Sequence, residues 1–180
     1  FNPFQENTYI LYDETKECVI IDPGCYDANE KKMLSRFIEE NALKPIYLLN
    51  THCHIDHVLG NRYVFEQYHL KPRIHDKEAM LLDAAQGYGK MYGILMEGSP
   101  EPIIDLVEHD EIKFGNTTLK ILFTPGHSPG SVCFYSADDA TVIAGDVLFK
   151  QSIGRTDLPG GSMEQLMESI RTRLLILDDN

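Results

Sequence analysis

Apolar side chains recur with two different periods along the first half of the chain. Residues 8–12 and 18–21 are short apolar runs separated by polar residues, which predicts a hairpin of two strands. Residues 28–42 carry apolar side chains at helical spacing, and Asp27 with Glu30 three residues later is the pattern of a helix N-cap. The pattern then predicts a strand, a helix, a strand and a helix, over residues 46–49, 60–69, 72–75 and 77–85.

The second half of the chain is predicted to be mostly extended. Four apolar runs with turn signals between them predict strands over residues 112–114, 118–123, 131–136 and 141–144. A last helix is predicted over residues 162–177, with Ser162 and Gln165 placed as a capping box. Because strands dominate each half and helices lie between them, the order favours two facing sheets with helices outside.

Residues 86–102 differ in composition from the segments around them. Glycines and prolines alternate here with tyrosines and methionines. This composition predicts a long mobile loop with an adhesive apolar surface, which suits a lid or a wall of a substrate site. An insertion that packs on its own domain would have the same composition, so both interpretations stand.

Length and charge narrow the class of protein. The 180 residues suit one domain, residues 1–180, and the formal net charge of −12 argues against partners such as nucleic acid or an anionic membrane. No apolar run is long enough to cross a bilayer. Four cysteines without a CxxC pair predict reduced thiols in a cytoplasmic protein. The sequence carries no indication of oligomeric state.

The sequence at both ends of the chain suggests that the domain continues beyond it. It starts at Phe1, without Met, in a segment already heading into a strand, and it stops at Asn180 just after a helical pattern. We therefore expect the domain to be truncated at both ends, with any signal peptide or further module outside the given sequence.

Metal-ligand side chains gather in residues 51–57, which read Thr-His-Cys-His-Ile-Asp-His. His52 and His54 are two residues apart, so in an extended segment they point the same way and can bind one ion. Asp56 and His57 follow where the chain can turn, and they can reach a second ion beside the first. Imidazole and carboxylate are ligands of zinc and of similar divalent metals.

Two further predicted strands end in residues of the same chemistry. His127 lies in a rigid Pro-Gly-His-Ser-Pro-Gly turn, and Asp146 follows Gly145. Each is a weak signal alone. With the cluster at residues 51–57, His127 can complete a site of three nitrogens and Asp146 can bridge two ions.

The combination His-x-His-x-Asp-His, Pro-Gly-His and Gly-Asp resembles the metallo-β-lactamase superfamily, over nearly the whole chain. The resemblance implies an α/β fold, a four-layered αββα sandwich of two mixed β-sheets flanked by helices, with the metals at one edge. It also implies a first metal bound by His52, His54 and His127, a second bound by Asp56 and His57, a bridge by Asp146, and support of the ligands by Asp22.

One ligand of this family pattern has no match. The superfamily usually supplies a last histidine to the second metal from a Gly-His turn near the C-terminus, and no histidine follows His127 here. We attribute this difference to truncation. The expected cofactors are two divalent ions, with zinc favoured and iron or manganese also compatible, and with the second site incomplete in the given sequence.

Residues 145–161 resemble the glyoxalase II group, in particular its small bacterial members without a C-terminal helical domain. In the larger enzymes of this group, a lysine and a tyrosine of this loop contact glutathione. Arg155 falls on the position of the lysine and keeps its charge, whereas Asp157 replaces the tyrosine and has the wrong sign for a carboxylate ligand. Arg155 is thus a candidate for substrate binding or for a pair with Asp157.

The resemblance implies a metal-dependent hydrolase of small-molecule thioesters of the S-acylglutathione type. A hydroxide held between the metals would attack the thioester carbonyl, with Asp56 and Asp146 as the catalytic carboxylates. Alternatives within the same fold are a mono-iron persulfide dioxygenase and a hydrolase of lactones or β-lactams. A non-catalytic, metal-poor interaction domain also stays open.

Overall fold

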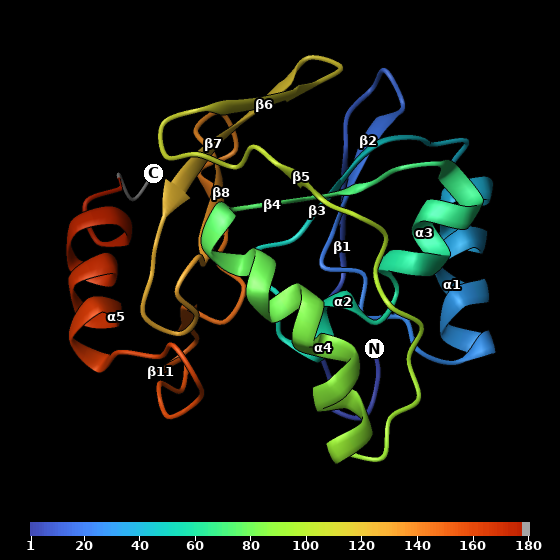
Figure 1. The fold of residues 1–180 in the computed structure, drawn as a ribbon. Helices are drawn as coiled ribbons and strands as arrows, with labels where there is room; N and C mark the ends of the chain where they lie inside the picture. Colours follow the sequence, from blue (N-terminus) through green and yellow to red (C-terminus); the bar gives the residue numbers. More distant parts are fainter. Residues whose placement is uncertain (178–180) are drawn as a thin grey trace.

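A computed structural model describes residues 1–177 (Figure 1), and the last three residues of the predicted domain lie outside the described part. The first sheet has five strands in the order β1-β2-β3-β4-β5. Their bounds are Tyr9–Tyr12, Glu17–Ile21, Lys44–Leu49, Pro72–Ile74 and Ile103–Ile104. The predicted hairpin of β1 and β2 is confirmed as antiparallel, and the remaining pairs are parallel, so this sheet is mixed.

The second sheet has four strands in the order β6-β7-β8-β9. They span Glu111–Phe114, Thr117–Phe123, Val132–Ser136 and Thr141–Ile143. All described pairs are antiparallel, so the expectation of a second mixed sheet does not hold for these strands. The physical reason is that strands consecutive in the sequence pair with each other here. The loops that join them are direct and lack the crossover that parallel strands need. A small hairpin of β10 (Leu148–Phe149) and β11 (Ser152–Ile153) follows.

Helices cover the outer face of each sheet. The helical segments are α1 (Ala28–Glu40), α2 (Ile55–Val58), α3 (Asn61–Tyr68), η1 (Asp76–Glu78), α4 (Ala79–Met91), α5 (Met163–Ser169) and the π-helical turn η2 (Ile170–Leu174). In Figure 1, α1 and α3 lie on one side of the first sheet, and α5 lies on the far side of the second. The predicted capping box of α1 is confirmed, because Asp27 accepts from the Glu30 amide and Glu30 accepts from the Asp27 amide.

Alternation along single strands explains the layers. In β2, Cys18 and Ile20 pack against α1, whereas Val19 and Ile21 face the second sheet. In β8, Phe134 points into the core between the sheets, and Cys133 packs on the other face with Leu166 of α5. Successive side chains of a strand point to opposite faces, so each of these strands is covered on both sides. The αββα sandwich that the resemblance implied is confirmed.

The helix predicted at 60–69 is confirmed as α3, whereas two other helical stretches were not predicted. The helix predicted at 60–69 is preceded by α2, so Asp56 and His57 lie on a helical turn. The loop predicted from residue 86 is helical up to Met91, because α4 continues through two glycines. A side chain at Gly89 would lie 3.0 Å from the Ile94 carbonyl oxygen, so this glycine lets the following segment pack closely against α4. Residues 92–102 have no regular secondary structure.

Two other observations bear on the sequence predictions. All four cysteines are free and buried, as predicted for reduced thiols. Among residues 1–177, no helix is both long and apolar enough to cross a membrane.

Candidate metal centre

The candidate ligands lie just beyond the carboxyl ends of strands from both sheets. Asp22 follows β2, His52 and His54 follow β3, His127 follows β7, and Asp146 follows β9. The structure brings them together, with Asp56 and His57 of α2, into three overlapping groups of ligand atoms that lie within 4.8 Å of one another. These groups are His52, His54 and His127; Asp22, His52 and His57; and Asp56, His57 and Asp146.

The first group consists of three imidazoles whose nitrogens converge on one point. The Nε2 atom of His127 lies 2.9 Å from Nδ1 of His54 and 3.2 Å from Nε2 of His52. The rings of His52 and His54 are nearly perpendicular, with centroids 4.7 Å apart. His52 and His127 are buried and His54 is partly buried, so these nitrogens have little access to water.

Hydrogen bonds on the opposite ring atoms define which nitrogens carry lone pairs. The Nδ1 atom of His127 donates to the Arg155 carbonyl at 2.8 Å. The Thr51 hydroxyl donates to Asp22 at 2.5 Å, so it accepts from Nδ1 of His52 at 3.1 Å. The Nε2 atoms of His52 and His127 therefore present lone pairs to each other at 3.2 Å. A divalent cation between them fits this donor set.

Asp56, His57 and Asp146 form the second of the two ligand groups that face the pocket, and in it a histidine lies between two carboxylates. The Nε2 atom of His57 is 3.6 Å from Asp56 Oδ2 and 3.4 Å from Asp146 Oδ1. The other oxygen of Asp146, Oδ2, lies 3.5 Å from Nε2 of His127 in the first group. The two oxygens of Asp146 thus face different groups, which is the arrangement that a bridging ligand requires.

Asp22 lies behind the candidate ligands and orients two of them. Its carboxylate accepts from the Thr51 amide at 2.7 Å and the Thr51 hydroxyl, and it accepts from Nδ1 of His57 at 3.0 Å. It therefore fixes the tautomer of His57 directly and that of His52 through Thr51. Asp22 has a positive φ of 49°, an uncommon conformation for a residue other than glycine, and such strain is frequent at functional sites.

Burial sets the charge of the three imidazoles. Desolvation, together with the neighbouring rings, lowers the pKa of His54 to about 3 and that of His52 well below its ordinary value. The pKa of His127 is also lowered, first by burial. These rings are neutral at physiological pH, which is the form that binds metal. Burial alone would lower the pKa of His57, but the surrounding carboxylates, Asp22 first, raise it well above its ordinary value.

Sequence reasoning missed Glu78, which joins the two histidine loops. Its buried carboxylate accepts from the Cys53 amide at 2.7 Å, between His52 and His54. It also accepts from the Ser128 hydroxyl, next to His127, and from the Gly130 amide at 2.6 Å. One side chain thus holds loops that are more than 70 residues apart in the sequence. Nothing in the sequence around Glu78 signals this role, since the residue lies in an ordinary charged run, Asp-Lys-Glu.

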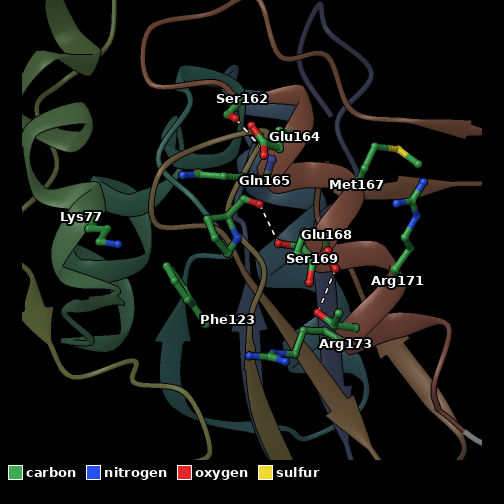
Figure 2. Close-up of a pocket in the computed structure, with 12 residues that line it drawn as sticks. Lys77, Phe123, Ser162, Glu164, Gln165, Met167, Glu168, Ser169, Arg171 and Arg173 are labelled. Carbon is green, nitrogen blue, oxygen red and sulfur yellow. Dashed lines mark hydrogen bonds between the residues drawn. The ribbon is translucent and has the colours of Figure 1, made fainter.

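The turn that carries His127 is also held from the side of α5. The Ser169 hydroxyl donates to the Pro125 carbonyl at 2.7 Å, and the Ser162 amide donates to the Gly126 carbonyl at 2.7 Å. Figure 2 shows Ser162 and Ser169 at the hollow of about 870 Å³ beside α5. None of the candidate ligands lines this hollow, so it lies apart from the metal centre.

The side chain of Arg155 is directed to Asp157. Two hydrogen bonds of 2.7 Å join the guanidinium to that carboxylate, and both side chains are exposed. The pair within the loop, one of the two interpretations of Arg155, is therefore present. Arg155 also lines a pocket beside the ligands, so substrate binding by its side chain stays a prediction.

We expect Gly154→Ala to disturb the centre, because the loop approaches the ligands closely there. An added Cβ would lie 1.8 Å from the Asp146 carbonyl oxygen and 3.1 Å from His127 Nδ1. The loop must shift, at a cost of about 1–3 kcal/mol in the free energy of unfolding, and the bond from His127 to the Arg155 carbonyl weakens.

Thermal unfolding and bound-metal analysis test this prediction against Gly87→Ala. A side chain at Gly87 meets nothing within 4 Å, and the residue lies in α4, so this control should be neutral or slightly stabilising. Equal melting temperatures and metal contents in the two variants would contradict the proposed close approach.

Comparisons with known proteins agree with this geometry. A family model described as the metallo-beta-lactamase superfamily matches residues 1–178. The probable metallo-hydrolase YqgX of Bacillus subtilis is 41% identical over 181 residues, which cover 99% of this chain and 82% of that protein. The hydroxyacylglutathione hydrolase GloC of Haemophilus influenzae is 35% identical over 188 residues, which cover 98% of this chain and 82% of that protein. The mitochondrial persulfide dioxygenase ETHE1 of Mus musculus is 30% identical over 174 residues, which cover 96% of this chain and 60% of that protein.

Solved structures extend the comparison to the metal centre. The crystal structure of the BLEG-1 B3 metallo-beta-lactamase has a TM-score of 0.87 and 36% identity, covering 99% of this chain and 85% of that one. The structure of TTHA1623 in a di-iron-bound form has a TM-score of 0.86 and 35% identity, and the match covers 98% of this chain and 84% of that one. With the clusters of histidine and aspartate, the di-iron neighbour supports a dinuclear metal site. By fold, ligand clusters and family match, this chain belongs to the metallo-β-lactamase superfamily of metal-dependent hydrolases.

Proposed function

We propose that this protein hydrolyses thioesters of the S-acylglutathione type. The observation that carries the proposal is the position of Asp146, whose two oxygens face the two ligand groups at 3.4 and 3.5 Å, at the edge of an open pocket. A pair of divalent ions held there would supply a nucleophile at neutral pH and stabilise charge on the carbonyl oxygen. The proposed ligands are His52, His54, Asp56, His57, His127 and Asp146.

The residues around the pocket suit direct attack by water. Asp56 is partly exposed and lines the pocket, so its carboxylate can orient the attacking water and accept its proton. Cys53 also lines the pocket but is only 1% exposed and packs in a core cluster, so it is not placed to attack a carbonyl. Cleavage releases a thiolate whose conjugate acid has a pKa of about 8.5, so the leaving group needs no proton donor.

The similarity to GloC supports this choice of substrate, because that relative is named a hydroxyacylglutathione hydrolase and aligns with nearly the whole chain. Two other reactions have support of the same kind. The structural neighbour BLEG-1 is a B3 metallo-beta-lactamase, and the relative ETHE1 is a persulfide dioxygenase. The three reactions differ in their substrates, so direct assays can separate them.

One assay series separates these functions. S-lactoylglutathione hydrolysis, hydrolysis of a chromogenic cephalosporin, and oxygen uptake with glutathione persulfide are measured on the same metal-loaded sample, with bound metal quantified. Thioester turnover with close to two metals per chain is the expected result. Oxygen uptake with one iron per chain would replace the proposal by the dioxygenase, and cephalosporin turnover without thioester turnover would replace it by a β-lactamase.

A further inference from the structure

A pocket of about 350 Å³ opens directly beside the two ligand groups. Four candidate ligands, His54, Asp56, His127 and Asp146, form part of its lining, so a molecule in this pocket lies against the proposed reaction centre. Most of the remaining wall is apolar or aromatic. The residues concerned are Phe4, Leu81, Tyr88, Met91, Tyr92 and Leu158.

Several apolar side chains of this wall are exposed to solvent. Phe4 is 44% exposed, Tyr92 is 61% exposed and Met91 is 80% exposed. The rings of Phe4 and Tyr92 meet edge to face with centroids 6.0 Å apart, which joins the N-terminal segment to the end of α4 at the pocket. Exposed apolar side chains that surround a concave site next to a few polar groups are typical of a ligand-binding pocket.

The side chains that line the pocket offer no free positive charge to an anionic group. Among the described residues that line it, Arg155 is the one cationic side chain, and Asp157 already binds its guanidinium through two hydrogen bonds of 2.7 Å. Outside the proposed metal centre, the two carboxylates of a glutathione moiety therefore find no free cationic side chain among the residues that line this pocket, whereas an uncharged apolar group finds a matching surface.

We propose that this pocket binds the acyl group of the thioester and that it favours longer apolar acyl chains over shorter ones. The inference rests on the proposed thioesterase function. With the carbonyl carbon beside Asp56 and Asp146, an apolar acyl chain extends along Tyr88 and Tyr92. The charged thiol moiety then stays outside the pocket, in contact with solvent. Tyr92 and Met91 are specificity-determining residues in this arrangement.

Binding of thioether analogues tests the pocket without turnover. S-hexylglutathione and S-methylglutathione cannot be hydrolysed, and they differ only in the apolar chain. We expect calorimetry on the metal-loaded protein to give a dissociation constant at least about 10-fold lower for the hexyl compound. Tyr92→Ala should reduce that preference to below about 3-fold, because it weakens binding of the hexyl compound more than binding of the methyl compound.

Two further variants serve as controls. Tyr92→Phe keeps the ring and should keep the preference. Met80→Ala truncates a residue of α4, the helix that ends just before Tyr92; Met80 is 83% exposed and does not line the pocket, so this variant should also keep the preference. Equal affinity for the two analogues, or a hexyl preference that Tyr92→Ala does not change, would overturn the proposal.

Turnover of S-hexanoylglutathione and S-acetylglutathione separates this proposal from the thioesterase on which it rests. We expect kcat/KM to favour the hexanoyl substrate by at least about 10-fold. Hydrolysis of both at equal kcat/KM would overturn the acyl pocket and leave the thioesterase standing. Preferred binding of the hexyl thioether without hydrolysis of either thioester would overturn the thioesterase and the assignment to an acyl group, while an apolar pocket remains.

Discussion

Alanine in place of Asp146 is expected to reduce kcat/KM by at least about 10³-fold, equivalent to about 4 kcal/mol of transition-state stabilisation. The carboxylate is the one side chain whose two oxygens approach both His57 and His127, at 3.4 and 3.5 Å, among the described residues. Without it, the two ligand groups lose the side chain that faces both. The second group then keeps only Asp56 and His57, so bound metal should fall towards one ion per chain.

The controls separate this effect from a change in folding. Asp146→Asn preserves the shape but removes the negative charge, and we expect it to lose activity to a similar degree. Asp138→Ala removes an exposed carboxylate from the turn between β8 and β9 and should behave as the wild type. Wild-type turnover in Asp146→Ala, with two metals retained, would refute the bridging position.

The candidate ligand residues were predictable because most of them lie close together in the sequence. His52, His54, Asp56 and His57 stand within six residues, a density of ligand side chains that a polar surface loop seldom reaches by chance. His127 and Asp146 could be added because each follows an apolar strand. The structure brings all six together, and their roles as ligands stay predictions. The layers of the fold were predictable for a related reason, since alternation within each strand reports which faces are buried.

The support of the centre was not predictable, because it depends on contacts between distant segments. Gly154 matters because it lies close to Asp146, and Tyr92 matters because its ring meets that of Phe4, which is distant in the sequence. Local sequence also misplaced the end of α4, because glycine favours a loop when only propensity is considered. At Gly89 the packing of Ile94 and Met96 outweighs that propensity. Strands of two residues, such as β5, show no periodicity and were missed.

Replacement of Glu78 is the second change from which we expect a large effect. Glu78→Ala leaves the buried amides of Cys53 and Gly130 without an acceptor and opens a space between two loops. Each unpaired buried group costs about 1–3 kcal/mol, so the free energy of unfolding should fall by about 2–5 kcal/mol. Both loops carry candidate ligands, so we also expect metal affinity to fall by about 10–100-fold, as for other residues that orient ligands.

Metal affinity distinguishes a positioning role of Glu78 from a purely structural one. Glu78→Gln keeps one acceptor oxygen but turns an amide group towards a backbone N–H, so it should lose part of the metal affinity while still folding. Leu34→Ala opens a cavity under α1 and should destabilise the protein by about 2–5 kcal/mol without touching either histidine loop. We therefore expect metal titrations of the folded proteins to show weaker binding in Glu78→Gln and unchanged binding in Leu34→Ala. Equal loss of metal affinity in both variants would reduce Glu78 to a contributor to global stability.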